Sequence, residues 1–377
     1  MIKLKNTPEQ LELVRAIGSK DLEVSREAMA AFSNAIGPVI GQVLYQAGTA
    51  SLIFNDQTFL EDENPSYPLD LYFGENAGYT TVWSNSTQPG GLPTSEIYGA
   101  AEMKVHTYRL DSAVSFLKKY ARKNALNILE KAIERMINEV LVKQELQAWS
   151  VLLMALAQSS TPVNGTATAH TAAAGTAGLF LLGDLSKLIT LARRINHSYA
   201  EGTAVQPYSK GITDLFVSPE TKEQIRAFAY NPMNNKAGVL SGTSSAGYTS
   251  TFVPLPDAVR EEIYRSAGTS ELFGINITDL NELGAGYKYN LLFGTFASGN
   301  IAPGNTTFNS GTNEIMVGVD LTKGACIRFV ESDEGGSTFN TMPDEQFIVR
   351  NEKVGFYGYV CEGRVVLDGR ALLGLVI

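Results

Sequence analysis

The chain has 377 residues, of which 44% are hydrophobic and 18% charged, so it can bury a sizeable core and is not broadly disordered. The charged fraction lies below the roughly 25% typical of soluble domains, which suits a protein that covers much of its surface with copies of itself. The net charge of −9 excludes the basic character expected of a strong nucleic-acid binder.

The two cysteines, Cys326 and Cys361, are too few for a disulfide framework or a zinc site. Both fall in strand-like runs, so we expect buried free thiols. The start of the chain, residues 1–6, lacks the apolar core of a signal peptide. The apolar run from Val151 to Ala157 is too short to span a bilayer, so we expect no membrane contact.

Two helices are predicted first. Residues 8–17 carry apolar side chains at helical spacing, and Pro8 suits a first helical turn. A second helix is predicted over residues 22–36. It should end before Gly37-Pro38, because proline cannot continue a helix and restricts the residue before it.

An acidic segment follows at residues 51–80, which contain no Lys or Arg. Pro65 and Pro68 interrupt any helix there. We therefore expect an extended arm that runs over a surface rather than a core element. Its acidic residues are Asp56, Glu61, Asp62, Glu63, Asp70 and Glu75.

Residues 79–85 and 101–107 both alternate between two faces, which predicts a hairpin with a long connection. The tip consists of Gln88, Pro89, Gly90, Gly91, Leu92 and Pro93 within residues 86–93. Trp83 on the first strand either packs against its own helix or anchors in a neighbouring subunit, where aromatic residues are enriched.

One very long helix is predicted from Arg122 to Gln158. At 1.5 Å per residue it spans about 55 Å, whereas helices average roughly 11 to 12 residues. Residues 104–143 hold nine Lys or Arg against four acidic residues. We expect the acidic arm to lie near the basic start of this helix, in the same or a neighbouring subunit, unless both stretches are simply solvated. The basic residues are Lys118, Lys119, Arg122 and Lys123.

The remaining sequence mixes helices and strands without strict alternation, which indicates the α+β class. Residues 159–178 and 231–251 are small and polar and predict flexible loops. Helices are predicted over residues 182–199 and 256–265, and another begins with Ser218 as its cap and Pro219 at its first position. The predicted strands cover residues 212–217, 272–279, 287–295, 314–319, 325–330, 346–350, 354–360 and 365–367.

No catalytic, cofactor-binding or metal-ligating residue is predicted. The three histidines, His106, His170 and His197, lack metal-ligand or triad spacing and are interpreted as solvated surface. Residues 242–247 lack the glycine spacing of a nucleophile elbow. Residues 331–336 lack the ligand alternation of a calcium loop. A ligand pocket in the 231–251 region stays open as an alternative.

The order of these parts resembles the major capsid proteins of tailed bacteriophages. The resemblance rests on the helix at residues 122–158, the strand-to-helix entry at 216–220, and the closing strands at 351–359 and 364–368. It implies a Hong Kong 97-type fold with an N-arm (1–75), an extended E-loop hairpin (76–112) and a peripheral domain with a spine helix (113–180). An axial domain (181–340) and returning peripheral strands (341–377) complete it.

The resemblance further implies a shell subunit without enzymatic activity or cofactor, located in the virion and assembled in the host bacterial cytoplasm. Its expected partners are copies of itself in pentamers and hexamers, with scaffolding, portal or decoration proteins. Packaged DNA is expected to make only weak, non-specific contact. The alternatives are an encapsulin-like compartment and a soluble α+β enzyme or ligand-binding protein.

Overall fold

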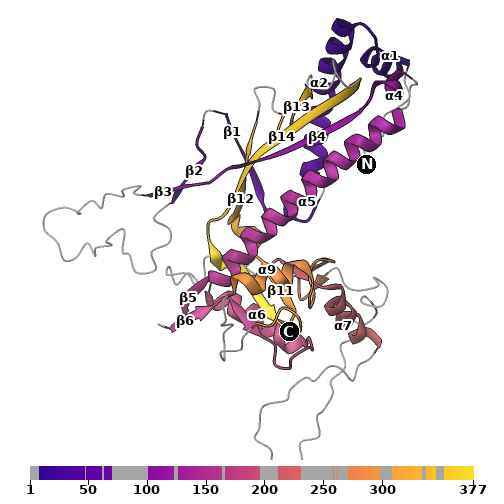
Figure 1. The fold of residues 1–377 in the computed structure, drawn as a ribbon. Coiled ribbons are helices and arrows are strands. Elements are labelled where there is room, and N and C mark those ends of the chain that lie inside the picture. The colour runs from indigo at the N-terminus through magenta and orange to yellow at the C-terminus, as the bar shows by residue number, and fades with distance from the viewer. Residues whose placement is uncertain are drawn as a thin grey trace, which may run out of the picture.

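The computed structural model describes residues 8–46, 48–61, 63–69, 101–122, 126–163, 166–195, 211–230, 258, 261, 271–297, 308–332, 337–344 and 352–377. The predicted α+β class is confirmed (Figure 1). The helices in this part of the chain include α1 (Pro8–Ile17), α2 (Leu22–Gln46), α3 (Ala50–Ile53), α4 (Lys118–Arg122), α5 (Leu126–Gln158), α6 (Leu182–Ile195), α7 (Pro219–Tyr230) and α9 (Lys288–Phe296).

The strands form two larger sheets and two ribbons. The upper sheet in Figure 1 holds β1 (Asn55–Phe59), β12 (Cys326–Glu331), β14 (Lys353–Val366), β13 (Asn340–Asp344) and β4 (Tyr108–Leu117). The lower sheet has the order β7 (Thr171–Ala173), β15 (Leu372–Val376), β11 (Ile315–Val319), β8 (Asp214–Val217), β10 (Ile275–Asp279) and β9 (Glu271–Leu272). The ribbons pair β2 (Ser66–Leu69) with β3 (Ala101–Lys104) and β5 (Ser160–Val163) with β6 (Thr166–Ala169).

Strand β14 is the centre of the upper sheet. Its residues 353–362 pair with β4 along one edge, while β13 and then β12 pair along the other. One face of this sheet is covered by α2 and α5, and side chains such as Phe356 and Val360 are buried there. The opposite face of β4, β14 and β13 is covered by no described helix.

The lower sheet is buried on both faces, which explains the continuous apolar runs of β11 and β15. Phe216 and Val317 pack in one core with the end of α5 and with α9, whereas Leu215 and Met316 pack in another with α6. Two short 3-10 helices carry the chain between the sheets. Helix η3 (Leu321–Lys323) joins β11 to β12, and η5 (Gly369–Ala371) joins β14 to β15.

Helix α5 runs through both lobes (Figure 1) and confirms the predicted long helix, although it begins at Leu126 and residues 123–125 lie outside the described chain. Its 33 residues span about 50 Å. By length and composition, Glu130–Gln158 could cross a membrane, a longer stretch than the apolar run considered above. Here its apolar side chains pack into the upper core through Ile133, Met136, Ile137 and Val140, and into the lower core through Trp149, Leu152, Leu153 and Leu156.

The prediction that the second helix ends at Gly37-Pro38 is wrong, because α2 continues to Gln46. Pro38 lies on the exposed face, where the carbonyl that loses its helical partner can be hydrated. Gly37 permits close packing on β13, since a Cβ there would come within 3.0 Å of Thr341 Oγ1. Ser33 and Thr341 also exchange side-chain hydrogen bonds with each other's carbonyls at 2.6 and 2.7 Å.

The prediction of an arm that only crosses a surface is also wrong for residues 50–59. Ile53, Phe54 and Phe59 are buried, and β1 pairs in parallel with β12. The hairpin prediction is corrected in register, because residues 101–104 pair with residues 66–69. Residues 79–85 lie outside the described chain.

Three further predictions are corrected. Residues 159–178 contain β5, β6 and β7 rather than a flexible loop. The predicted strand at 287–295 is the helix α9, in which Tyr289 and Phe293 are buried one turn apart. The separate strands at 354–360 and 365–367 are one strand, β14. Residues 231–251, 256–257 and 346–350 lie outside the described chain.

Candidate subunit-interaction surfaces

The β2–β3 ribbon leaves the body on the side away from α4, as Figure 1 shows. The stretch from residue 61 to residue 104 that contains it carries seven acidic residues and one basic residue, Lys104, at the end of β3. Of the predicted contact residues in this region, Glu61 and Glu63 are exposed, and Glu63 accepts from the backbone N–H of Leu60 at 3.2 Å. Asp62, Trp83 and residues 88–93 lie outside the described residues.

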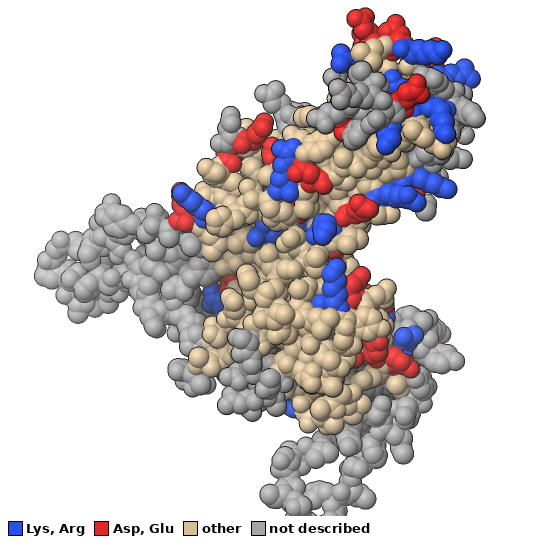
Figure 2. All heavy atoms as spheres, viewed as in Figure 1, with Lys and Arg blue, Asp and Glu red and all other residues tan. Residues whose placement is uncertain are grey.

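The basic residues near α4 differ from one another. Lys119 is exposed and lies over the Tyr120 ring at 5.2 Å, whereas Lys118 is only 5% exposed. Arg122 ends α4, and Lys123 lies outside the described residues. Figure 2 shows Lys and Arg gathering with Asp and Glu at this end of the molecule. Lys131 and Arg135 of α5 add two exposed basic residues.

Asp56 lies in the upper sheet and forms an ion pair with Arg328 of the same subunit. The prediction that Asp56 lies near the basic residues of α4 in its own chain is therefore wrong. Asp56 Oδ2 accepts from Arg328 Nη1 at 3.0 Å. Burial raises the pKa of the Asp56 carboxyl above its usual value, against the lowering effect of Arg328 and Arg364. Asp56 is therefore part of the joint between β1 and β12.

This joint centres on Glu362, which is 0% exposed. Its Oε2 accepts from Arg328 Nε at 2.7 Å and from Gln144 Nε2 at 3.2 Å, and it pairs with Arg364 Nη2 at 3.4 Å. Its Oε1 accepts from the Tyr108 hydroxyl at 2.6 Å. Opposite charges and saturated acceptors make this burial tolerable. The network fixes α5 onto β4, β12 and β14.

The uncovered face of the upper sheet, which we call the tyrosine face, carries a polar and aromatic cluster. It consists of Arg109, Asp111, Met342, Tyr357 and Tyr359. Arg109 donates to Asp111 Oδ1 and to the Tyr357 hydroxyl, both at 2.8 Å, and lies 3.8 Å from the centroid of the Tyr359 ring. Hydrogen bonds from Tyr357 and Arg109 lower the pKa of the Asp111 carboxyl.

Interface cores are enriched in Tyr, Met and Arg, so this composition fits a contact surface. Met342 is 50% exposed beside the two tyrosines. This face is not among the predicted surfaces, because residues 108–117 were not predicted to form a strand. The alternation of Arg109 and Asp111 with Leu110 and Ser112 was the available signal.

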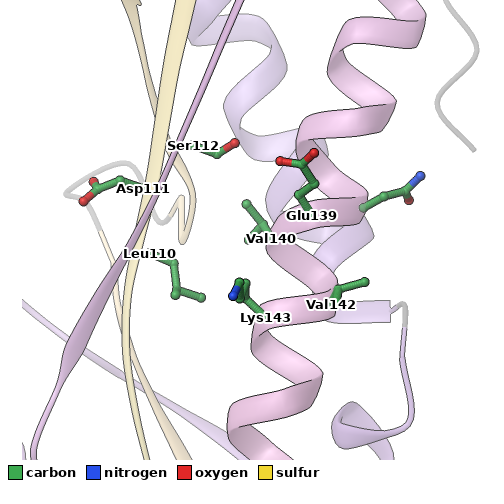
Figure 3. A pocket seen from close by; sticks show the side chains of 8 residues that line it. Leu110, Asp111, Ser112, Glu139, Val140, Val142 and Lys143 are labelled. Atoms are coloured by element: carbon green, nitrogen blue, oxygen red, sulfur yellow. The ribbon is translucent and has the colours of Figure 1, made fainter. Parts of the chain in front are cut away.

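A groove of about 400 Å³ lies between β4 and α5. Figure 3 shows Leu110 and Val140 pointing into the space between strand and helix, whereas Asp111 points away. The groove has no convergent set of polar groups of the kind that fixes a substrate. The residues that line it are Leu110, Asp111, Ser112, Asn138, Glu139, Val140, Val142 and Lys143.

The two cysteines and one of the histidines are at least partly buried in the fold. The prediction of a buried free thiol is confirmed for Cys326, whereas the free thiol Cys361 is only half-buried, and burial raises the pKa of Cys326 to about 12. No group of three or more His, Cys, Asp or Glu suited to a metal ion occurs among the described residues. The prediction of a solvated His170 is wrong, because it is 1% exposed.

No family model matches the chain, and no curated protein matches it. Among solved structures, the chain is similar to the capsid of cyanophage P-SCSP1u, with 15% identity, 85% coverage of each chain and a TM-score of 0.48. It is also similar to the capsid of an empty GTA particle, with 13% identity, coverage of 88% and 90%, and a TM-score of 0.48. The SrpI encapsulin of Synechococcus elongatus matches with 7% identity, coverage of 73% and 75%, and a TM-score of 0.37.

Proposed function

We propose that this chain is the major capsid protein of a tailed bacteriophage, a subunit that self-assembles into the icosahedral head shell enclosing the viral DNA. The placement of the β2–β3 ribbon carries the proposal. The ribbon leaves the body (Figure 1), and its residues Ser66, Glu102 and Lys104 are exposed on its own chain. A partner on another copy would supply the missing contacts.

Charge supports a head-to-tail contact between copies. The ribbon region, residues 61–104, has seven acidic residues and one Lys, while the end near α4 presents Lys119, Lys131 and Arg135 beside exposed acidic residues of α1. The β2–β3 ribbon and α4 lie far apart on one subunit, as Figure 1 shows, so the acidic ribbon region would meet these Lys and Arg residues on the next copy. A heterologous contact of this kind closes into rings when its rotation fits, which accommodates pentamers and hexamers.

The parts keep the roles that the resemblance implies. Residues 1–75 act as the N-arm and residues 76–112 as the E-loop hairpin. Residues 113–180 and 341–377 form the peripheral domain around the spine helix, and residues 181–340 form the axial domain. The shell is assembled in the bacterial cytoplasm with scaffolding, portal or decoration proteins. At a net charge of −9, contact with packaged DNA is weak.

Negative-stain microscopy of the purified protein tests the proposal. We expect closed or sheet-like assemblies built from rings of subunits. DNA inside the shells supports the viral reading, whereas a packaged enzyme would assign the chain to an encapsulin-like compartment. Dispersed single subunits that bind a small molecule in the groove between β4 and α5 would overturn both shell readings and favour a ligand-binding protein.

A further inference from the structure

His170 lies where the end of the long helix meets the connection between the two sheets. Ser159 and β5 directly follow α5, and the backbone N–H of His170 donates to Ser159 O at 3.2 Å. The His170 carbonyl accepts from the N–H of Gly374 in β15 at 2.9 Å. Its ring lies 2.7 Å from the carbonyl of Gly369 in η5 and 2.8 Å from the hydroxyl of Thr161 in β5.

These contacts define the protonation state of the ring. A carbonyl oxygen can only accept, so Nδ1 carries the hydrogen and donates to Gly369 O. Nε2 is then the free acceptor for the Thr161 hydroxyl. Both ring nitrogens are satisfied when His170 is neutral. A second proton on Nε2 would face the Thr161 oxygen and force its hydroxyl hydrogen to turn away.

Few charges are available to stabilise an imidazolium at this position. Asp368, which caps η5, and Arg370 within it act on the ring with opposite signs, and they bind each other at 3.1 Å. Residues 146–173, which include the end of α5 and β5, β6 and β7, contain no Asp, Glu, Lys or Arg, and neither does β15. Burial lowers the pKa of the His170 imidazole below its usual value, and backbone hydrogen bonds to Gly369 and Leu372 only partly oppose this.

Gly369 makes the close approach possible. A Cβ at this position would lie 2.2 Å from Ser159 Oγ and 3.9 Å from His170 Cε1. The crossover and the end of the long helix are therefore packed without room between them. Loss of the His170 contact would release both segments together.

We propose that His170 is an acid-released latch between the long helix and the crossover that joins the two sheets. The neutral ring holds residues 159–161 against residues 369–374. The unfolded chain binds a proton at His170 at about pH 6.5, whereas the folded protein binds it only at a lower pH. The stabilisation by the neutral ring is therefore present above about pH 6.5 and is lost as the pH falls below it. The latch does not depend on the shell function.

Backbone hydrogen exchange of the full chain at about pH 7.5 and about pH 5.5 tests the latch. After correction for intrinsic exchange, we expect opening of residues 159–171 and 366–374 to rise on acidification, by at most about tenfold per pH unit for one proton. His170→Gln cannot titrate and should abolish this rise. His106→Gln, at an exposed histidine, should leave it unchanged.

Side-chain hydrogen exchange of the wild-type histidines gives a measurement that needs no variant. We expect His170 to titrate below the pH of about 6.5 that is usual for an unperturbed histidine. Titration of His170 at or above that pH would overturn the proposal. An unchanged pH response in a folded His170→Gln protein would overturn it as well.

Discussion

Arg328 Nε donates a hydrogen bond to Glu362 Oε2 at 2.7 Å. This pair links β12, which pairs with β1, to β14, the central strand of the upper sheet. The same carboxylate also accepts hydrogen bonds from Tyr108 of β4 and from Gln144 of α5. Four elements thus depend on one buried anion. Their arrangement sets where the ribbon leaves the body relative to the long helix.

Glu362→Gln should destabilise the subunit by about 3–5 kcal/mol, because it leaves the buried Arg328 and Arg364 without their shared counter-charge. The free energy of unfolding in urea measures the effect. Glu139→Gln is the matched control on the exposed side of α5, and we expect it to change stability by no more than about 0.5 kcal/mol. Equal effects of the two substitutions would contradict the assigned role of the network.

One glycine substitution should destabilise and another should not. Gly358→Ala places a Cβ 2.6 Å from the ring of Phe339, which is buried between α2 and the sheet, so we expect a loss of about 1–3 kcal/mol from overpacking. Gly183→Ala, in α6, meets nothing within 4 Å and should stabilise by about 0.4–1 kcal/mol. Thermal unfolding of both variants checks the opposite signs, and a shared sign would refute the packing argument.

Deletion of residues 86–95 should leave a folded subunit that assembles poorly or into fragile shells. Ordering Gly90 and Gly91 at the tip costs backbone freedom, so burial of Leu92 or Trp83 would have to drive it, at roughly 1.5–3 kcal/mol for each side chain. Particle yield and heat resistance measure the outcome. Normal values for both would show that the hairpin is not an intersubunit clamp.

Neutralising Lys119 and Arg122 together should weaken assembly and reduce its salt dependence. Each exposed pair contributes only about 0–1 kcal/mol, but a shell repeats the contact many times. Arg193→Gln with Arg194→Gln, on the exposed side of α6, is the matched control. If assembly responds equally to both double substitutions, the acidic ribbon does not select the end near α4. Lys118 is left unchanged because it is buried.

Local signals predicted several elements well. Ser218 caps α7 as expected, and its Oγ accepts from the Thr221 N–H at 3.0 Å. The helix at residues 8–17 and the strand at 314–319 also follow from their patterns. These segments contain their own start and stop signals, so no distant contact is needed to define them.

Elements that depend on distant partners were not predictable in this way. Helix α2 continues past Pro38 because Gly37 and Ser33 pack on β13, more than 300 residues later. The run 287–295 is short and apolar, a pattern that strands and buried helices share. The helix is held by a distant contact of Asn290. Its side-chain amide donates to Asn313 O at 2.5 Å and accepts from Ile315 N–H at 3.3 Å.

Among the candidate surfaces too, some features follow from the local sequence and others depend on tertiary contacts. The acidic character of residues 51–80 and the basic residues at the start of the long helix follow from local composition alone. The tyrosine face required the pairing of Asp111 with Tyr359 and of Met342 with Tyr357 across three strands. The burial of Lys118 and the Asp56–Arg328 pair likewise depend on tertiary contacts that the local sequence does not contain.

Sedimentation velocity of the purified chain, across protein concentration and salt, tests the shell assignment most directly. The account predicts fast-sedimenting ring or shell species that dissociate as salt screens the contact between the acidic ribbon region and the Lys and Arg residues near α4. A stable interface typically buries about 1,200–2,000 Å², so such species should persist on dilution at low salt. A single species of 40.7 kDa under every condition would contradict the account.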